Sequence, residues 1–165
     1  MKPFRVRGGD LVARFDAAEA GVLGLLLDQL EQLLTAEADD VGDDPVIERL
    51  LPAGHRSDAG IAADYRAMTE SALRDGKADD LATVRATLPP AGGDVRLDPE
   101  QAAAWLRTSN DLRLALGTRL DITEDTEPPE DVTGEEGQQL ALYYWLTAVQ
   151  GSLVDGLAAA RAGRR

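Results

Sequence analysis

The excess of leucine and alanine over β-branched residues restricts the fold of this chain more than any motif does. The 165 residues include 24 Leu and 26 Ala, against 10 Val and 3 Ile. Leu and Ala lose little side-chain freedom in a helix, whereas β-branched residues favour strands. A chain of this length can also bury a sizeable core without disulfides or metals. We therefore expect a single, mainly α-helical domain over residues 1–165.

The first residues are the exception, and they predict a two-stranded β-hairpin over residues 4–15. Apolar and polar residues alternate on both sides of Gly8-Gly9, which supplies a two-residue turn. Pairing across this turn places Arg5 and Arg14 on one face. The other face is apolar and carries Phe4, Val6, Leu11, Ala13 and Phe15. We expect this apolar face to dock on helices, because an isolated hairpin is marginally stable in water.

Capping patterns divide residues 16–160 into a helical bundle of about five or six helices. Asp16 and Glu19 have the spacing of a capping box. Asp44 and Asp98 each precede a proline, which suits the first turn of a helix. The helix that follows Asp98 is expected to be central.

Glycines and prolines predict where the middle helices end. One helix is expected to begin at residue 57 or 58 and to end near Gly76. The next is expected to begin at residue 79 or 80 and to end at Leu88, before Pro89-Pro90. Residues 91–94 read Ala-Gly-Gly-Asp and predict a flexible connector.

Two uninterrupted segments near the C-terminus differ sharply in charge. Residues 121–136 hold eight acidic residues, no basic residue and two adjacent prolines, which predicts an acidic, solvated loop. Residues 137–154 are uncharged over 18 positions but include Gln, Gly, Ser and Thr. We interpret this second segment as a buried helix rather than a membrane span.

Net charge and the lack of cysteine narrow the classes of function. A net charge of −13 repels phosphate groups, which argues against direct binding to nucleic acid or to an anionic membrane. The chain has no Cys, so it holds no disulfide, thiolate metal site, cysteine nucleophile or thiol sensor. These features, and an N-terminus without the apolar core of a signal peptide, predict a cytoplasmic protein.

Motifs for catalysis, metal binding or cofactor binding are not recognisable, so we expect no enzyme, no metal and no cofactor. The single histidine, His55, lies in a loop and has no HExxH-type spacing. Residues 39–44 resemble the start of a calcium loop but lack its closing Glu. The Gly8-Gly9 and Gly92-Gly93 pairs lack the lysine of a phosphate loop.

A set of polar residues interrupts the apolar central helix. Buried arginines need a compensating partner such as a carboxylate, which favours an internal ion-pair network between helices. The alternative is a polar pocket for a small ligand. The candidate pocket residues are Asn110, Asp111, Arg113 and Arg119.

The hairpin and the last helix supply the candidate protein interface. A two-stranded ribbon has open outer edges, and the uncharged last helix is apolar on more than one side. We expect a protein partner or a homodimer there, the alternative being that neighbouring helices cover both sides. The candidate contact residues are Arg5, Arg14, Tyr144 and Gln150.

Three stretches carry a resemblance to a known family: Trp105-Leu106, the run LRLALGTRL at 112–120, and YYWLT at 143–147. In these the chain resembles an actinobacterial family, defined as a domain of unknown function, that includes the oxidative-stress regulator AosR. The resemblance implies a cytoplasmic regulator that acts through protein partners, in transcription, and it supplies no catalytic residues. A regulator that senses oxidants with its own thiols needs cysteines, and this chain departs from that requirement.

Residues and resemblance together predict a non-enzymatic, cytoplasmic regulatory protein that acts through protein–protein interaction. The predicted setting is transcription control under oxidative stress, with no thiol sensor in this chain. The alternative is an enzyme or small-molecule binder with a polar pocket around Arg113 and Arg119. A third reading is an assembly subunit without a ligand.

Overall fold

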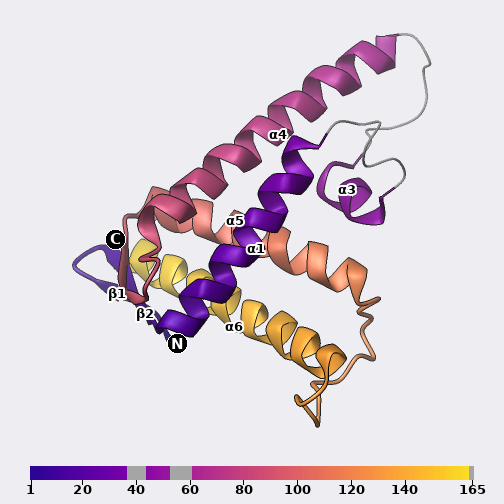
Figure 1. Ribbon diagram of the computed structural model, residues 1–165. Coiled ribbons are helices and arrows are strands. Elements are labelled where there is room, and N and C mark those ends of the chain that lie inside the picture. The colour runs from indigo at the N-terminus through magenta and orange to yellow at the C-terminus, as the bar shows by residue number, and fades with distance from the viewer. Residues whose placement is uncertain (37–43, 53–60, 164–165) are drawn as a thin grey trace.

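Five helices and three strands make up the part of the protein that is described (Figure 1). The computed structural model describes residues 1–36, 44–52 and 61–163. The expectation of a mainly helical chain is confirmed. In chain order the elements are β1 (Lys2–Arg7), β2 (Asp10–Phe15), α1 (Ala17–Thr35), α3 (Pro45–Leu50), α4 (Ile61–Thr87), β3 (Gly93–Leu97), α5 (Pro99–Arg119) and α6 (Glu135–Ala162).

The N-terminal sheet has three antiparallel strands in the order β1-β2-β3, so the prediction of a two-stranded hairpin was wrong in strand number. The expected flexible connector at 91–94 instead runs into β3, which pairs with the free edge of β2. Val95 and Leu97 alternate with polar neighbours, and both are buried. The segment forms a strand because it covers the edge of β2 and because it buries these two side chains.

The hairpin itself follows the predicted register near its turn. Arg7 pairs with Asp10, and Val6 pairs with Leu11. The predicted pairing of Phe4 with Ala13 falls where the register shifts, between residues 2 and 5. The predicted apolar face is confirmed as buried apart from Val6, which is half-buried: the buried members are Phe4, Leu11, Ala13 and Phe15.

α4 is one continuous helix of 27 residues, so the two helices predicted on either side of Gly76 were wrong. A glycine inside a helix costs only about 1 kcal/mol relative to alanine. Burial of Leu81 and Val84 in the second half of α4 outweighs that cost. The first half extends away from the bundle (Figure 1) and carries exposed side chains such as Met68, which is 74 % exposed.

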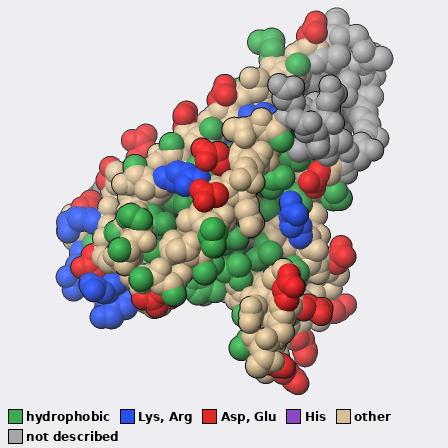
Figure 2. All heavy atoms as spheres, in the orientation of Figure 1, with side chains coloured by type: hydrophobic (Ala, Val, Ile, Leu, Met, Phe, Trp, Pro, Cys, Tyr) green, Lys and Arg blue, Asp and Glu red, His purple; other side chains and the backbone are tan. Residues whose placement is uncertain are grey.

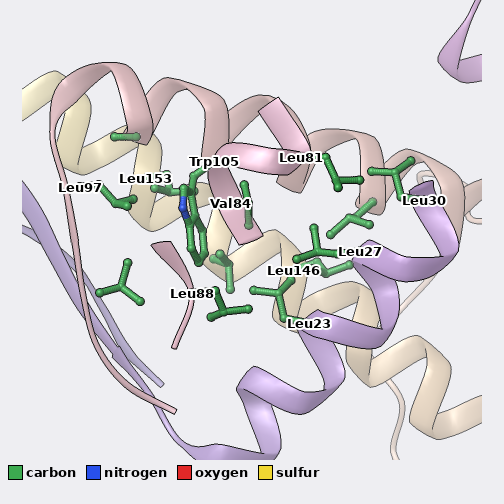
Figure 3. Close-up of a cluster of buried hydrophobic side chains, with 14 of the residues drawn as sticks. Leu23, Leu27, Leu30, Leu81, Val84, Leu88, Leu97, Trp105, Leu146 and Leu153 are labelled. Atoms are coloured by element: carbon green, nitrogen blue, oxygen red, sulfur yellow. The ribbon is translucent and has the colours of Figure 1, made fainter. Parts of the chain in front are cut away.

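The core lies between the apolar face of the sheet and the helices around Trp105 (Figure 3). The Trp105 ring lies 5.5 Å from the ring of Phe4 and 5.7 Å from that of Phe15, between centroids. Its Nε1 donates a hydrogen bond to Thr87 Oγ1 at 2.7 Å. α6 packs against α5 and against β1 and β2, while α4 packs against α1 and α5. The surrounding side chains include Leu23, Leu27, Leu81, Val84, Leu88, Leu146 and Leu153.

The acidic segment between α5 and α6 is largely solvated, as predicted. All eight carboxylates of residues 121–136 are exposed. The first half of the segment is nevertheless attached to the helices. The amide of Ile122 donates to the Gly117 carbonyl oxygen at 2.9 Å, and Tyr144 Oη donates to the Thr126 carbonyl oxygen at 2.6 Å.

Replacing Gly92 with alanine is expected to destabilise the fold. Gly92 has a φ of +75°, and a Cβ atom there would lie 2.5 Å from the carbonyl carbon of Asp16 and 2.7 Å from the amide nitrogen of Ala17. The left-handed backbone and the overlap are both unfavourable for alanine, so the free energy of unfolding should fall by at least about 2 kcal/mol. Urea unfolding followed by circular dichroism measures the change.

Gly76→Ala is the matched control for this prediction. Gly76 lies inside α4, and no heavy atom outside its own helical turn lies within 4 Å of the place of a Cβ atom. Alanine there should raise the free energy of unfolding by about 0.5–1 kcal/mol. Equal effects of the two substitutions would contradict the close approach of residue 92 to the start of α1.

Candidate functional site

A buried ion pair joins α4 to α5. Lys77 Nζ donates a hydrogen bond to Asp111 Oδ1 at 2.7 Å, and Asp111 is only 5 % exposed. Burial raises the pKa of the Asp111 carboxyl above its ordinary value of 3.8, while the hydrogen bond and charge of Lys77 act in the opposite direction. Because a buried carboxylate without a partner is unfavourable, this pair fixes how the two helices pack.

A hollow of about 480 Å³ opens beside this ion pair. Lys77, Asp111 and Asn110 line it together with a second ion pair, in which Arg107 donates from Nε and Nη2 to the two carboxylate oxygens of Asp80 at 2.7 Å and 2.6 Å. Both cations of the hollow therefore already hold a carboxylate. Because the lining cations are already neutralised by carboxylates, this hollow has little net attraction for a charged ligand.

A second polar contact joins α5 to α6. Arg113 Nη1 donates to Gln150 Oε1 at 2.7 Å, and Gln150 Nε2 donates to Asn110 Oδ1 at 3.1 Å. Arg113 Nε also donates to Tyr143 Oη at 3.3 Å, and its guanidinium carbon lies 5.6 Å from the centroid of the Tyr143 ring. We predicted a carboxylate partner for a buried arginine. The half-buried Arg113 instead uses an amide oxygen and an aromatic face.

A hollow of about 740 Å³ lies on the outer side of Arg113. Thr118, Thr123 and Glu124 line it, and the ring of Tyr143 closes one side. The guanidinium has five N–H donors, of which Gln150 and Tyr143 take two. The remaining donors suit an oxyanion or a carbonyl oxygen of a small ligand.

The four predicted pocket residues do not converge on one point. Asn110 and Arg113 are linked through Gln150. Asp111 points to α4, on another side of the helix, where it meets Lys77. Arg119 is exposed near the end of α5 and does not line the hollow beside Arg113. A ligand pocket at this place stays a prediction.

The four predicted interface residues fall into two separate places. Arg5 and Arg14 are exposed on the sheet, where Arg14 Nη1 pairs with Asp94 Oδ1 at 3.0 Å. Tyr144 is half-buried on α6, and its Oη donates a hydrogen bond to the Thr126 carbonyl oxygen in the acidic loop. Gln150 is occupied by its contacts with α5. Whether either place binds a partner stays a prediction.

The structure adds a group of basic residues that sequence reasoning missed. Figure 2 shows Lys and Arg side chains gathered at the end of the molecule that carries β1 and β2. We call this group the basic sheet face. The alternation of residues 94–97 was the available signal, because it would have brought the third strand, and Arg96, into the sheet. The members are Lys2, Arg5, Arg7, Arg14 and Arg96.

Two further observations concern metals and membranes. Across residues 1–36, 44–52 and 61–163, no group of three or more His, Cys, Asp or Glu side chains is placed to hold a metal ion. Nor does any helix in those ranges have both the length and the apolar character to cross a lipid bilayer. His55 lies outside the described residues, and so do residues 39–43 of the stretch 39–44 that resembles the start of a calcium loop.

Comparison with known protein families resolves the resemblance noted in the sequence. The family described as "Domain of unknown function (DUF2017)" matches residues 1–157, which is nearly the whole chain. The chain belongs to this family. The match takes in the sheet, all of the described bundle apart from the last turns of α6, and the acidic loop. The predicted family membership is confirmed.

Curated relatives cover most of the chain. The oxidative stress regulator AosR of Mycobacterium tuberculosis is 29 % identical over 161 residues, which span 88 % of this chain and 72 % of the relative. An AosR relative from Mycobacterium leprae is 33 % identical over 152 residues, which span 81 % of this chain and 68 % of that protein. No solved structure matches the chain.

Lys77→Met is expected to destabilise the protein by about 3 kcal/mol at neutral pH, because it leaves the Asp111 carboxylate buried without a partner. The loss should shrink as the pH falls. A raised pKa means that the folded protein binds this proton more tightly than the unfolded chain does, so the contribution of Asp111 to stability falls as pH rises above about 4. Urea unfolding of the wild type and the variant at pH 7 and at pH 5 measures how the loss of unfolding free energy changes with pH.

Lys2→Met is the control, because Lys2 is exposed and has no ion pair among the described residues. It should change the free energy of unfolding by less than about 0.5 kcal/mol at either pH. A Lys77→Met loss that stays the same at both pH values would contradict the assignment to Asp111.

Proposed function

We propose that this protein is a non-enzymatic regulator of the oxidative stress response that acts by binding another protein. The observation that carries the proposal is the extent of the similarity to relatives named oxidative stress regulators, which reaches 88 % of the chain. The family match over residues 1–157 includes the sheet and most of the bundle. The regulatory role in this proposal is taken from the names of those relatives.

The packing of the bundle supports binding rather than catalysis. Three of the four polar side chains of α5 that sequence reasoning singled out are hydrogen-bonded to neighbouring helices: Asp111 to Lys77, and Asn110 and Arg113 to Gln150. Groups held in this way stabilise helix packing, and a catalytic acid or base needs access to a substrate. Among the described residues, Arg5 and Arg7 are exposed charged groups without an ion pair, and in this proposal such groups are available to a protein partner.

Because this chain has no cysteine, the proposal places the oxidant-sensing step on the partner protein. With no thiol in the chain, peroxide has no sulfur to convert to a sulfenic acid or a disulfide here, apart from the thioethers of two Met residues. The oxidised thiol then belongs to the protein that this one binds. The partner in this proposal is a cytoplasmic component of transcription, and a net charge of −13 keeps this chain itself off DNA.

A second candidate function is supported by the hollow beside Arg113. Its volume of about 740 Å³ is in the range of small-ligand sites, and Arg113 is among its lining residues. A small oxyanion that binds there would raise the melting temperature of the wild-type protein, and Arg113→Leu would remove that rise. No rise with any oxyanion tested would eliminate this candidate.

A capture experiment with separate oxidation of each component tests the proposal. The purified protein is immobilised and exposed to lysate of its own host, after peroxide treatment of either the immobilised protein or the lysate. Because the chain has no Cys, oxidising it alone should leave capture of the transcription component unchanged. Oxidising the lysate should change that capture, and mass spectrometry of the bound proteins measures it.

Deleting the gene provides the functional arm. The deletion strain should differ from wild type in survival and in transcript response under peroxide, and a restored copy of the gene should remove the difference. Heat stress serves as the control and should give equal survival. A peroxide response that is the same with and without the gene would refute the regulatory role.

A further inference from the structure

Positive charge is concentrated on one face of a strongly acidic protein. The chain has 30 acidic and 17 basic residues, yet the solvent face of the sheet carries five cations. Only two of them have partners there: Arg14 with Asp94, and Arg96 with Asp10 at 2.7 Å. Lys2, Arg5 and Arg7 are exposed and make no ion pair with any described residue. The basic sheet face therefore has a net positive charge in a molecule of net charge −13.

The register of the strands places one pair of these cations directly opposite each other, whereas Arg7 lies opposite Asp10. Lys2 pairs with Arg14 across β1 and β2, and Arg5 and Arg96 both flank Val12. Like charges that lie directly opposite each other on a sheet are unfavourable. Asp10 and Asp94 neutralise part of the charge of the face, but Arg5 and Arg7 make no ion pair with any described residue. The positive charge that is left uncompensated makes this face complementary to an anionic partner.

The shape of the face fits an extended chain. A hollow of about 480 Å³ runs over it, with Val12 and Pro3 among its apolar lining and the cations around them. Arg5 and Arg7 lie on the same side of β1, two residues apart, which is about 7 Å along a strand. Carboxylates at every second position of an extended peptide have the same spacing. Each guanidinium can hold one carboxylate through two parallel hydrogen bonds.

We propose that the basic sheet face docks an extended acidic segment of a partner protein, with Arg5 and Arg7 binding carboxylates at alternate positions. This inference rests on the proposed function for the claim that the chain works by binding a protein, and it adds the chemistry of the partner. Val12 and the aliphatic stems of the arginines contact the apolar parts of the bound segment.

The charge of the rest of the molecule favours a peptide over a nucleic acid. A nucleic acid carries charge along its whole length and would extend beyond five cations onto an acidic surface, where it is repelled. A short acidic segment can place its carboxylates on the basic sheet face, while the remainder of the partner leaves the surface and is not repelled. The same repulsion limits binding elsewhere, so an acidic segment is directed to this one face.

Fluorescence anisotropy with the purified full-length protein tests the proposal. The probe is a short fluorescein-labelled peptide in which Glu alternates with Ser, and the comparison peptide has Gln in place of Glu. Arg5→Glu and Arg7→Glu should each weaken binding at least about fivefold, because each replaces an attraction with a repulsion at the surface. The matched control is Arg119→Glu, which makes the same charge change at another exposed arginine that has no ion pair with any described residue. It should leave affinity within about twofold.

A gain of binding excludes misfolding as the cause. Asp94 is 77 % exposed and holds Arg14, so Asp94→Asn frees one cation without removing packing. This variant should bind the Glu-Ser peptide about threefold more tightly. Circular dichroism of every variant should match that of wild type.

Four results would overturn the inference. These are no binding of the Glu-Ser peptide at low salt, equal binding of the Gln-Ser peptide, tighter binding of an oligothymidylate of equal charge, or equal weakening by Arg119→Glu. The assay uses neither peroxide nor host lysate, so it can fail while the peroxide phenotype holds. In that case the proposed function survives and its partner binds elsewhere. Peptide binding without a peroxide phenotype would keep the acidic-segment site and reject the stress role.

Discussion

The burial of the Trp105 indole is the interaction on which the rest of the structure depends. Trp105 extends from α5, and Phe4 of β1 and Phe15 of β2 pack against its ring. Thr87 of α4 accepts a hydrogen bond from the indole N–H. Phe15 also meets Trp145 of α6, with 6.3 Å between ring centroids. A sheet of such short strands is not stable in isolation, so its apolar face must remain on this cluster. The opposite face, with its arginines, is consequently held toward solvent.

Local signals were read correctly because their physical causes lie within a few residues. Asp16 and Asp98 both form the predicted capping boxes, in which a side chain three residues away satisfies the backbone amide. Gly76 shows where such reasoning fails, because the small local penalty of a glycine was outweighed by burial one turn and more beyond it. The strand at Val95 and Leu97 was missed for the same reason, since the partner that makes it a strand is about eighty residues away.

The candidate sites were only partly accessible from sequence. Asn110, Asp111 and Arg113 were singled out as unusual polar residues in an apolar helix, and all three do take part in contacts between helices. Successive helix positions differ by about 100°, so their partners had to come from different elements. Nothing in the sequence identified Lys77 and Gln150 as those partners. The basic sheet face likewise depends on a pairing between distant strands.

The uneven distribution of charge over the molecule affects how the protein is oriented as it diffuses toward a partner. The basic sheet face lies at one end, and the exposed carboxylates of the acidic loop lie at the N-terminal end of α6, tied down by the Tyr144 hydroxyl (Figures 1 and 2). Such a molecule has a large electric dipole moment and experiences a torque in the field of a charged neighbour. It would rotate during diffusion so that one end leads, and ionic strength would therefore act on the rate of productive encounter more than on the lifetime of a complex.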